Sequence, residues 1–352
     1  MDFLRKTLQE IQKPDQSVGE RIQRRLDRLT KPPESLGRLE ELAVWYGMSR
    51  GEIKPTLDKK AVVVFAADHG IADEGVSAFP REVTAQMVYN FLRGGAGINV
   101  LSRHVNAEVI VVDIGVAHDF EPAAGLRQSK VKHGTANMSK GPAMSPSEML
   151  SAIREGILLS EELARKGIDL LATGEMGIAN TTASSAITAV ITSHPVAGVT
   201  GRGTGVNDTQ LNHKIKVIEK ALQQNLPQQK DPLDVLAKVG GLEIAGLVGL
   251  ILGAARNRIP VVLDGFISGA AALIAVSLNP LVKEYLSASH QSVEPGHRLI
   301  LDWLGLVPLL NLNLRLGEGT GAVLGMGLVE AGVKVLSEMA TFDEAGVSDK
   351  EG

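Results

Sequence analysis

The stretch AVVVFAADHG (61–70) is a continuous apolar run that ends in a polar turn containing glycine. Such a run, with no alternation of polar residues, is typical of a strand buried on both faces of a parallel sheet. The same design recurs in EVIVVDIG (108–115), DLLATGEMG (169–177), PVAGVTGRGTG (195–205) and IPVVLDG (259–265). The sequence therefore predicts a strand in each of these five segments, followed each time by a glycine-rich turn.

Helical stretches lie between the predicted strands, for example at 149–166, 211–223 and 242–256. Strands that alternate with helices predict an α/β fold with a doubly wound parallel sheet and helices on both faces. Ligands of such folds bind beyond the carboxyl ends of the strands. Every glycine-rich turn quoted above lies at such an end, so these turns are the first candidates for a binding site.

Both ends of the chain are predicted to be helical. Leu4, Leu8 and Ile11 recur at helical spacing near the start, and residues 323–339 form an apolar helix near the end. We expect residues 1–50 and 308–352 to form a small helical domain together. Residues 51–307 then form a large α/β domain that binds substrate.

The composition excludes several classes of protein. The chain of 352 residues has 36 Lys and Arg against 40 Asp and Glu, so it has no basic excess that would hold nucleic acid. It contains no cysteine, which excludes disulfides, thiolate nucleophiles and zinc sites built from cysteine. Nucleic acid is therefore not an expected partner.

One segment, residues 265–282, carries no charge and has nearly the length of a membrane span. A span needs about twenty mostly apolar residues, and here Asn279 and Pro280 interrupt the run while glycine and serine dilute it. The first sixteen residues lack the apolar core of a signal peptide. We therefore expect a cytoplasmic protein with no contact with a membrane.

The motif RLGEGTG (315–321) places one carboxylate, Glu318, between glycines just before the C-terminal helix. Glycines leave room for a substrate beside the backbone, and a carboxylate placed in this way can act as a general base. The alternative is a helix-capping turn whose glutamate faces water. The pattern alone leaves both interpretations open.

The motif GEMGIANTT (174–182) follows a predicted strand and opens a helix. Asn180, Thr181 or Thr182 can cap that helix, and the free N–H groups at its start favour an anion such as phosphate. An ordinary strand-to-helix loop with a good cap would look the same.

The motif GRGTGVND (201–208) also leads into a helix, with Lys214 on its second turn. Its glycines match the dinucleotide-binding fingerprint only in part, since no third glycine falls in the required place. No Gly-Lys-Ser/Thr follows, so it is not a Walker loop either. The phosphate of a mononucleotide fits this loop better than a pyrophosphate does.

Asp68 and His69 could in principle bind a metal, but no second cluster with ligand spacing accompanies them. We expect them to order their loop by hydrogen bonds instead, and we predict no metal site. Ser77 and Gln86, further along the same stretch, could contact the polar edge of a flat substrate.

Taken together, these motifs resemble the nicotinate-nucleotide–dimethylbenzimidazole phosphoribosyltransferases of cobalamin biosynthesis. The matching stretches are spread over nearly the whole chain in the order of the family. They are KPPESLGRLE (31–40), FAADHGIADEGVSAFPREVTAQMV (65–88), GEMGIANTT (174–182), GRGTG (201–205), DGFISGAAAL (264–273), EPGH (294–297) and LRLGEGTGA (314–322). Each is weak alone, and together they are highly specific.

The resemblance implies a reaction. Nicotinate mononucleotide gives its 5-phosphoribosyl group to 5,6-dimethylbenzimidazole, yielding α-ribazole 5′-phosphate and nicotinate without a cofactor. Phosphoribosyltransferases that use a pyrophosphate donor carry paired acids after an apolar strand, and this chain offers only Asp264 there. The resemblance also implies a Rossmann-like sheet, a small helical domain built from both termini, and a homodimer.

The resemblance further assigns roles to residues. Glu318 corresponds to the general base, and Glu175 is a second catalytic residue on the acceptor side. The expected acceptor contacts are Ser77 and Gln86, with Met176 and Leu316 as apolar walls. The expected contacts with the donor phosphate and ribose are Gly177, Asn180, Thr181, Gly203, Thr204 and Lys214.

Two other interpretations stay open at this point. A nucleotide-binding sensor without catalytic activity would explain the glycine-rich loops but would leave Glu318 without a purpose. An NAD-dependent dehydrogenase would rest on GRGTG alone and would bind NADH.

Overall fold

A computed structural model describes residues 1–348 of the chain. Its centre is a sheet of six parallel strands in the order β3-β2-β1-β4-β5-β6. The strands are β1 (Lys60–Ala67), β2 (Ala107–Gly115), β3 (Leu126–Gln128), β4 (Leu170–Met176), β5 (Val261–Leu263) and β6 (Leu286–Ala288). The predicted α/β class with a Rossmann-like parallel sheet is confirmed.

Four of the five predicted strands are present, and the one at 195–205 is wrong. Residues Val196–Val199 form the short helix α8 instead, and the remaining residues form a loop. Pro195 stands at the N-cap of this helix, and the glycines that follow favour a loop over a paired strand. Strands β3 (LRQ) and β6 (LSA) were missed because they are short and polar residues interrupt them, whereas the equally short β5 (VVL) is wholly apolar.

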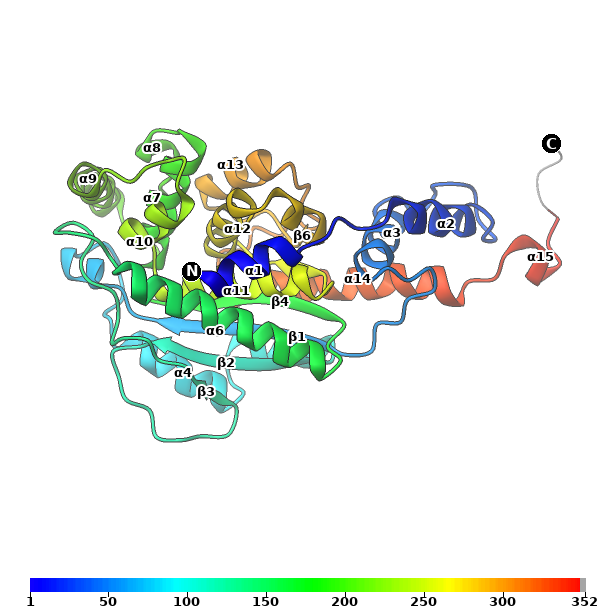
Figure 1. The fold of residues 1–352 in the computed structure, drawn as a ribbon, viewed down its shortest axis with the longest axis horizontal. Helices are drawn as coiled ribbons and strands as arrows, with labels where there is room; N and C mark the ends of the chain where they lie inside the picture. The colour runs from blue at the N-terminus through cyan, green and yellow to red at the C-terminus, as the bar shows by residue number, and fades with distance from the viewer. Residues whose placement is uncertain (349–352) are drawn as a thin grey trace.

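Helices surround this sheet and account for the rest of the regular structure (Figure 1). The helices are α1 (Asp2–Glu10), α2 (Gln16–Asp27), α3 (Arg38–Arg50), α4 (Val83–Leu92), α5 (Gly97–His104), α6 (Pro146–Arg165), α7 (Asn180–Thr192), α8 (Val196–Val199), α9 (Asp208–Asn225), α10 (Pro232–Val239), α11 (Leu242–Arg256), α12 (Phe266–Leu278), α13 (Pro295–Leu304), α14 (Thr320–Glu338) and α15 (Phe342–Ala345), with 3-10 helices η1 (Gly70–Glu74) and η2 (Pro280–Tyr285).

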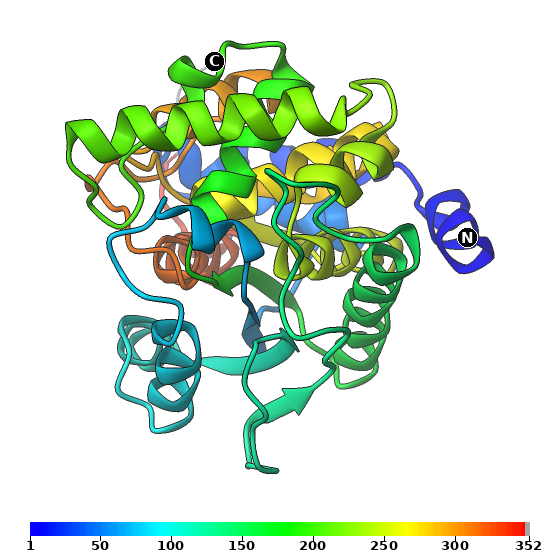
Figure 2. The ribbon, with the colours of Figure 1, turned by 90° about the vertical axis from the view of Figure 1, so that its left-hand side faces the viewer.

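Strand β1 is buried on both faces, as its unbroken apolar run predicts. Val63 and Phe65 pack into a core with α6, α11 and α12 on one face of the sheet. Val62 and Val64 pack with α4, α5 and α14 on the other face. Figure 2 shows these two helical layers on opposite sides of the strands.

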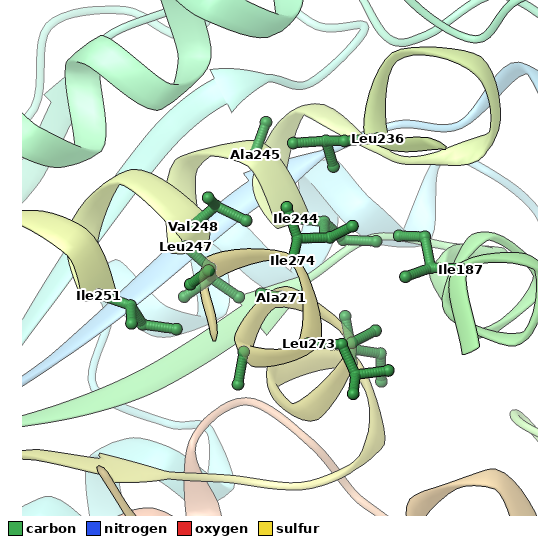
Figure 3. Close-up of a cluster of buried hydrophobic side chains, with 14 of the residues drawn as sticks. Ile187, Leu236, Ile244, Ala245, Leu247, Val248, Ile251, Ala271, Leu273 and Ile274 are labelled. Atoms are coloured by element: carbon green, nitrogen blue, oxygen red, sulfur yellow. The ribbon is translucent and has the colours of Figure 1, made fainter. Parts of the chain in front are cut away.

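The larger core continues beyond the sheet, between α7, α10, α11 and α12. Ile187, Leu236, Leu247 and Ile274 meet there, one from each helix (Figure 3). This apolar packing fixes the start of α7 relative to the sheet, and α7 begins directly after the carboxyl end of β4.

The long helix α14 connects the sheet with the N-terminal helices (Figure 1). Its Leu336 packs with Ile22, Leu26 and Leu29 in a separate small core. We propose on these contacts that residues 1–50 and 308–352 form the small helical domain expected from the sequence. Its last four residues, 349–352, lie outside the described part of the chain. Helix α1 is the exception, because its Leu4 belongs to the main core beside α11.

Among the described residues, α14 is the one helix long and apolar enough to cross a membrane. More than half of its most apolar stretch is buried within the fold, where it packs against the sheet. The uncharged segment noted in the sequence forms α12, which is shorter and lies in the main core. Packing inside the protein thus explains the apolar surface of both helices.

The order of the strands indicates where a ligand is expected to bind. Connections run to one side from β1 and to the other side from β4, so the direction of winding reverses between these neighbours. In open parallel sheets, ligands bind outside the carboxyl ends of the strands at this point. β1 ends at Ala67 and β4 at Met176, directly before the motifs singled out in the sequence.

Candidate active site

A cavity of about 710 Å³ opens at the carboxyl ends of the strands. Its walls come from the end of β4, the start of α7, the loop before α9 and the loop before α14. Nine residues predicted for the site line it: Glu175, Met176, Gly177, Asn180, Thr181, Gly203, Thr204, Leu316 and Glu318. Segments far apart in the sequence thus meet in one place.

The loop that carries Glu318 has an unusual backbone. Glu318 has a φ angle of 64°, between Gly317 at 80° and Gly319 at 96°. This left-handed conformation is unfavourable for a residue with a side chain, and it persists only where the surroundings hold it in place.

Asp264, directly after β5, holds this loop. Its carboxylate accepts hydrogen bonds from the backbone N–H groups of Gly319 at 3.0 Å, Gly321 at 2.8 Å and Ala322 at 3.1 Å. Asp264 is buried, and burial raises the pKa of its carboxyl group. From the sequence, Asp264 was notable only as an acid without a second acid beside it. The structure gives this side chain a positioning role that sequence reasoning missed.

The glycines beside Glu318 allow close packing of the loop, and Gly317 also lines the cavity. A Cβ atom on Gly317 would lie 2.5 Å from Oε1 of Glu175, and one on Gly319 would lie 2.7 Å from Val62. Gly174 on β4 packs in turn against the carbonyl group of Glu318. Only residues without side chains allow the loop to lie this close to the end of the sheet.

The Glu318 side chain is buried, with 6% of its surface exposed, and it lines the cavity. Its Oε2 atom accepts a hydrogen bond of 3.3 Å from the N–H of Ile98 at the start of α5. Burial, together with the nearby charge of Asp264, raises the pKa of Glu318, and the Ile98 amide partly opposes this. A carboxylate with a raised pKa beside a cavity suits general base chemistry.

Glu175 lies next to Glu318 and is also buried. Burial raises its pKa to about 8, and the carboxylates of Asp264 and Glu243 add to this effect. Hydrogen bonds from the Asn180 side chain and from the Glu318 backbone partly oppose it. At neutral pH this group is mostly protonated, which suits positioning better than the uptake of a proton.

Lys214, on the second turn of α9, does not line the cavity but lies behind its wall. Its Nζ atom donates to Oγ1 of Thr181 at 2.8 Å and to the carbonyl of Gly201 at 3.4 Å. Burial lowers the pKa of Lys214 to about 8, although the charge of Glu294 opposes the shift. The ammonium group of Lys214 therefore lies behind Thr181 at the start of α7 and behind Gly201 in the loop before α9.

The predicted cap of α7 by Asn180, Thr181 or Thr182 is wrong. The N-cap residue is Ala179, with a φ angle of 75° and no side-chain cap. Asn180 instead directs its amide to Glu175. No side chain therefore caps the start of α7, although the N–H groups of Asn180 and Thr182 donate to the carbonyls of Gly177 and Ala179. The dipole of the helix still favours an anion at this end.

Two predicted acceptor contacts do not line the cavity. Gln86 is exposed on α4, and the Ser77 hydroxyl lies 3.2 Å from that of Thr204, bridging two loops. Phe79, Val83 and Met87 line the cavity instead. Helical spacing was the signal that could have found this face, because the apolar residues Val83 and Met87 lie four positions apart on α4.

Asp68 and His69 order their surroundings through hydrogen bonds, as predicted. Oδ2 of Asp68 accepts from the N–H of Ala117 at 2.8 Å, and Nε2 of His69 lies 2.6 Å from Oε1 of Glu243. Among residues 1–348, no group of three or more acidic or histidine side chains could hold a metal ion.

The family model described as Phosphoribosyltransferase matches residues 11–347. By class, the chain is a phosphoribosyltransferase, and thus a pentosyltransferase, built on a parallel α/β sheet. Its relatives specify the family further. It is 60% identical to the nicotinate-nucleotide–dimethylbenzimidazole phosphoribosyltransferase of Geotalea uraniireducens, over 100% of both chains. It is 59% identical to the protein of the same name from Geobacter sulfurreducens, over 99% of both chains.

The crystal structure of CobT from Thermus thermophilus superposes with a TM-score of 0.91 at 47% identity, covering 95% of this chain and 100% of that one. The chain therefore belongs to the nicotinate-nucleotide–dimethylbenzimidazole phosphoribosyltransferase family.

Proposed function

We propose that the chain transfers the 5-phosphoribosyl group of nicotinate mononucleotide to 5,6-dimethylbenzimidazole, for the lower ligand of cobalamin. The observation that carries this proposal is one cavity that combines two carboxylates of raised pKa with a pair of loops backed by Lys214. The names of the relatives support the two substrates.

On the acceptor side, a ring nitrogen of the benzimidazole attacks C1′ of the ribose with inversion. The bond from C1′ to the pyridinium nitrogen breaks, and its electron pair leaves with nicotinate. The acceptor ring would become cationic, so its N–H proton passes to Glu318. Glu175 positions the acceptor and the Glu318 loop. Phe79 and Met87 add apolar walls beside Met176 and Leu316.

On the donor side, the phosphate lies against the loops at Gly177 and Gly203, near the start of α7. Asn180, Thr181 and Thr204 add polar contacts, and Lys214 supplies the charge from behind. The donor pyridinium is already a cationic leaving group, so no metal or cofactor is needed. We further propose that the protein acts in the cytoplasm as a homodimer.

The first test is a product analysis with nicotinate mononucleotide and a panel of bases, with and without EDTA. We expect α-ribazole 5′-phosphate and nicotinate from 5,6-dimethylbenzimidazole, at a rate that the chelator does not change. Absence of this product with 5,6-dimethylbenzimidazole would refute the proposed reaction. A rate lost in EDTA and restored by magnesium would refute the metal-free mechanism alone.

Replacing Lys214 tests the donor side. Lys214→Ala should raise the KM for the mononucleotide more than the KM for the base, because Thr181 and the Gly201 carbonyl lose the charged donor that lies behind the phosphate loops. In the wild type, kcat/KM for the mononucleotide should fall as the pH rises through about 8, because Lys214 then loses its charge.

The matched control is Lys216→Ala, which removes an exposed lysine two positions along α9 and should leave both KM values unchanged. The nucleoside without a phosphate should be a poor donor for the wild type. If that nucleoside reacts as well as the nucleotide, the loops do not bind a phosphate.

A further inference from the structure

Glu294 is a buried carboxylate that the mechanism above leaves without a task. It follows β6 and stands at the N-cap of α13, with 6% of its surface exposed. It lines the main cavity and also a neighbouring cavity of about 580 Å³, so it stands in the wall between them.

The two oxygens of Glu294 differ in their surroundings. Oε1 accepts a hydrogen bond of 2.9 Å from the N–H of Gly203. Oε2 is buried and has no hydrogen-bond partner within the part of the chain that the structure describes. A buried carboxylate oxygen without a donor is unfavourable, so such a group in a cavity wall calls for a donor from a ligand.

The backbone at Gly201 leaves room for this oxygen. A Cβ atom on Gly201 would lie 2.0 Å from Oε2 of Glu294, so only glycine allows the carboxylate to take this position. Gly201 belongs to the loop that we assign to the donor phosphate. Both oxygens of Glu294 therefore contact this loop, Oε1 at the N–H of Gly203 and Oε2 at Gly201.

The charges nearby restrict what Oε2 can bind. A phosphate oxygen would be repelled by the carboxylate, whereas a hydroxyl group can donate a hydrogen bond to it. The charge of Glu294 raises the pKa of Lys214, so a cation already stands close to this carboxylate. The ligand group opposite Oε2 is therefore a neutral donor.

We propose that Oε2 of Glu294 accepts a hydrogen bond from a ribose hydroxyl of the donor nucleotide. The proposal rests on the proposed function, in which the ribose joins the phosphate to the reacting C1′ atom. Glu294 is bonded to Gly203 of the phosphate loop and faces the same cavity as Glu318, which is where the sugar must lie. Acidic side chains bind ribose hydroxyls in the same way in dinucleotide sites.

This contact should matter more in the transition state than in the ground state. Breaking the bond at C1′ places positive charge on the sugar, and hydrogen bonds from its hydroxyl groups then strengthen. The carboxylate would therefore contribute to the rate as well as to binding.

The test compares Glu294→Gln with the wild type, using nicotinate mononucleotide and its 2′-deoxy and 3′-deoxy analogues. Glutamine keeps an oxygen for the N–H of Gly203 but replaces Oε2 with an NH₂ group, which cannot accept a hydrogen bond. The wild type should prefer the ribose donor over one of the deoxy donors about 10–100-fold in kcat/KM. In Glu294→Gln that ratio should fall to near one.

The control is Glu284→Gln, which changes an exposed glutamate outside the cavity and should keep the wild-type ratio. A wild type that uses both deoxy donors as well as the ribose donor would overturn the proposal without any variant. So would a Glu294→Gln variant that keeps the full ratio for both analogues.

Failure of the proposed function gives a different result. In that case the wild type forms no product from the ribose donor. The same comparison is then made with dissociation constants from calorimetry. A preference for the ribose donor that disappears in Glu294→Gln still supports the assignment, and equal binding of all three nucleotides to the wild type overturns it.

Discussion

Glu318→Gln is expected to lower kcat about 10²–10⁴-fold, the usual contribution of a general base, while substrate binding is largely kept. Glutamine preserves the shape of the side chain and can still accept from the N–H of Ile98. It cannot take the proton from the acceptor ring. The measurement is kcat at saturating concentrations of both substrates.

The pH dependence gives a second measurement on Glu318. A general base must be deprotonated, so kcat at saturating concentrations of both substrates should rise with pH through the pKa of Glu318 and then level off. Burial raises this pKa, so the rise should lie at a higher pH than for an ordinary glutamate. The rise should disappear in Glu318→Gln.

Two variants serve as controls for Glu318. Glu338→Gln, at the exposed end of α14, should have wild-type activity. Glu175→Gln should lower kcat less than Glu318→Gln does, because Glu175 is mostly protonated at neutral pH. Near-normal kcat in Glu318→Gln would show that Glu318 only orients the ring.

Asp264→Ala is expected to reduce both stability and activity. Three backbone N–H groups at the start of α14 would lose their acceptor, and each buried donor left unpaired costs about 1–3 kcal/mol. The free energy of unfolding should therefore fall by at least about 3 kcal/mol, measured by denaturant unfolding. The activity should fall too, because the left-handed backbone at Glu318 would lose its support.

Asp264→Asn separates these two effects. Oδ1 serves Gly321 and Ala322, and Oδ2 serves Gly319. Asparagine can keep the first two bonds, but its NH₂ group would then face the N–H of Gly319. Its loss of stability should be smaller than that of the alanine variant, while kcat should still fall. An alanine variant that unfolds at the same denaturant concentration as the wild type would contradict this role of Asp264.

Much of the fold could be predicted from local pattern. The runs at 61–67, 108–115, 169–177 and 259–265 each hold a strand, since strands buried on both faces need continuous apolar sequence. The run at 195–205 misled because it is apolar for only a few residues after a proline, which suits a short helix equally well. The short strands β3 (LRQ) and β6 (LSA) contain polar residues and so show no apolar run, unlike the equally short β5 (VVL).

The candidate site was predictable where its residues lie close to the end of a strand or the start of a helix. Nine predicted residues line the cavity, among them Glu175, Thr181 and Glu318. Gln86 does not line the cavity, because the face of α4 that points inward depends on how this helix packs on β1. Ser77 does not line it either, and its hydroxyl lies beside that of Thr204 in the loop before α9. A motif therefore locates the segment that forms the site, but it does not show which side chains of that segment point into the cavity.

By itself, the sequence determined the class of fold, the edge of the sheet at which the cavity opens, and most of the turns and helix starts that line it. These features are local, because apolar period, glycine and proline act within a few residues of each other. Three features were decided only by the tertiary structure. They are the role of Asp264 as acceptor for the N–H groups of the Glu318 loop, the burial of Lys214 behind Thr181, and the position of Oε2 of Glu294 without a hydrogen-bond donor among the described residues. Each of these depends on groups that are distant in sequence and meet only when the sheet and its helices have packed. The same packing excludes water from Glu175 and Lys214. This burial raises the pKa of Glu175 and lowers that of Lys214.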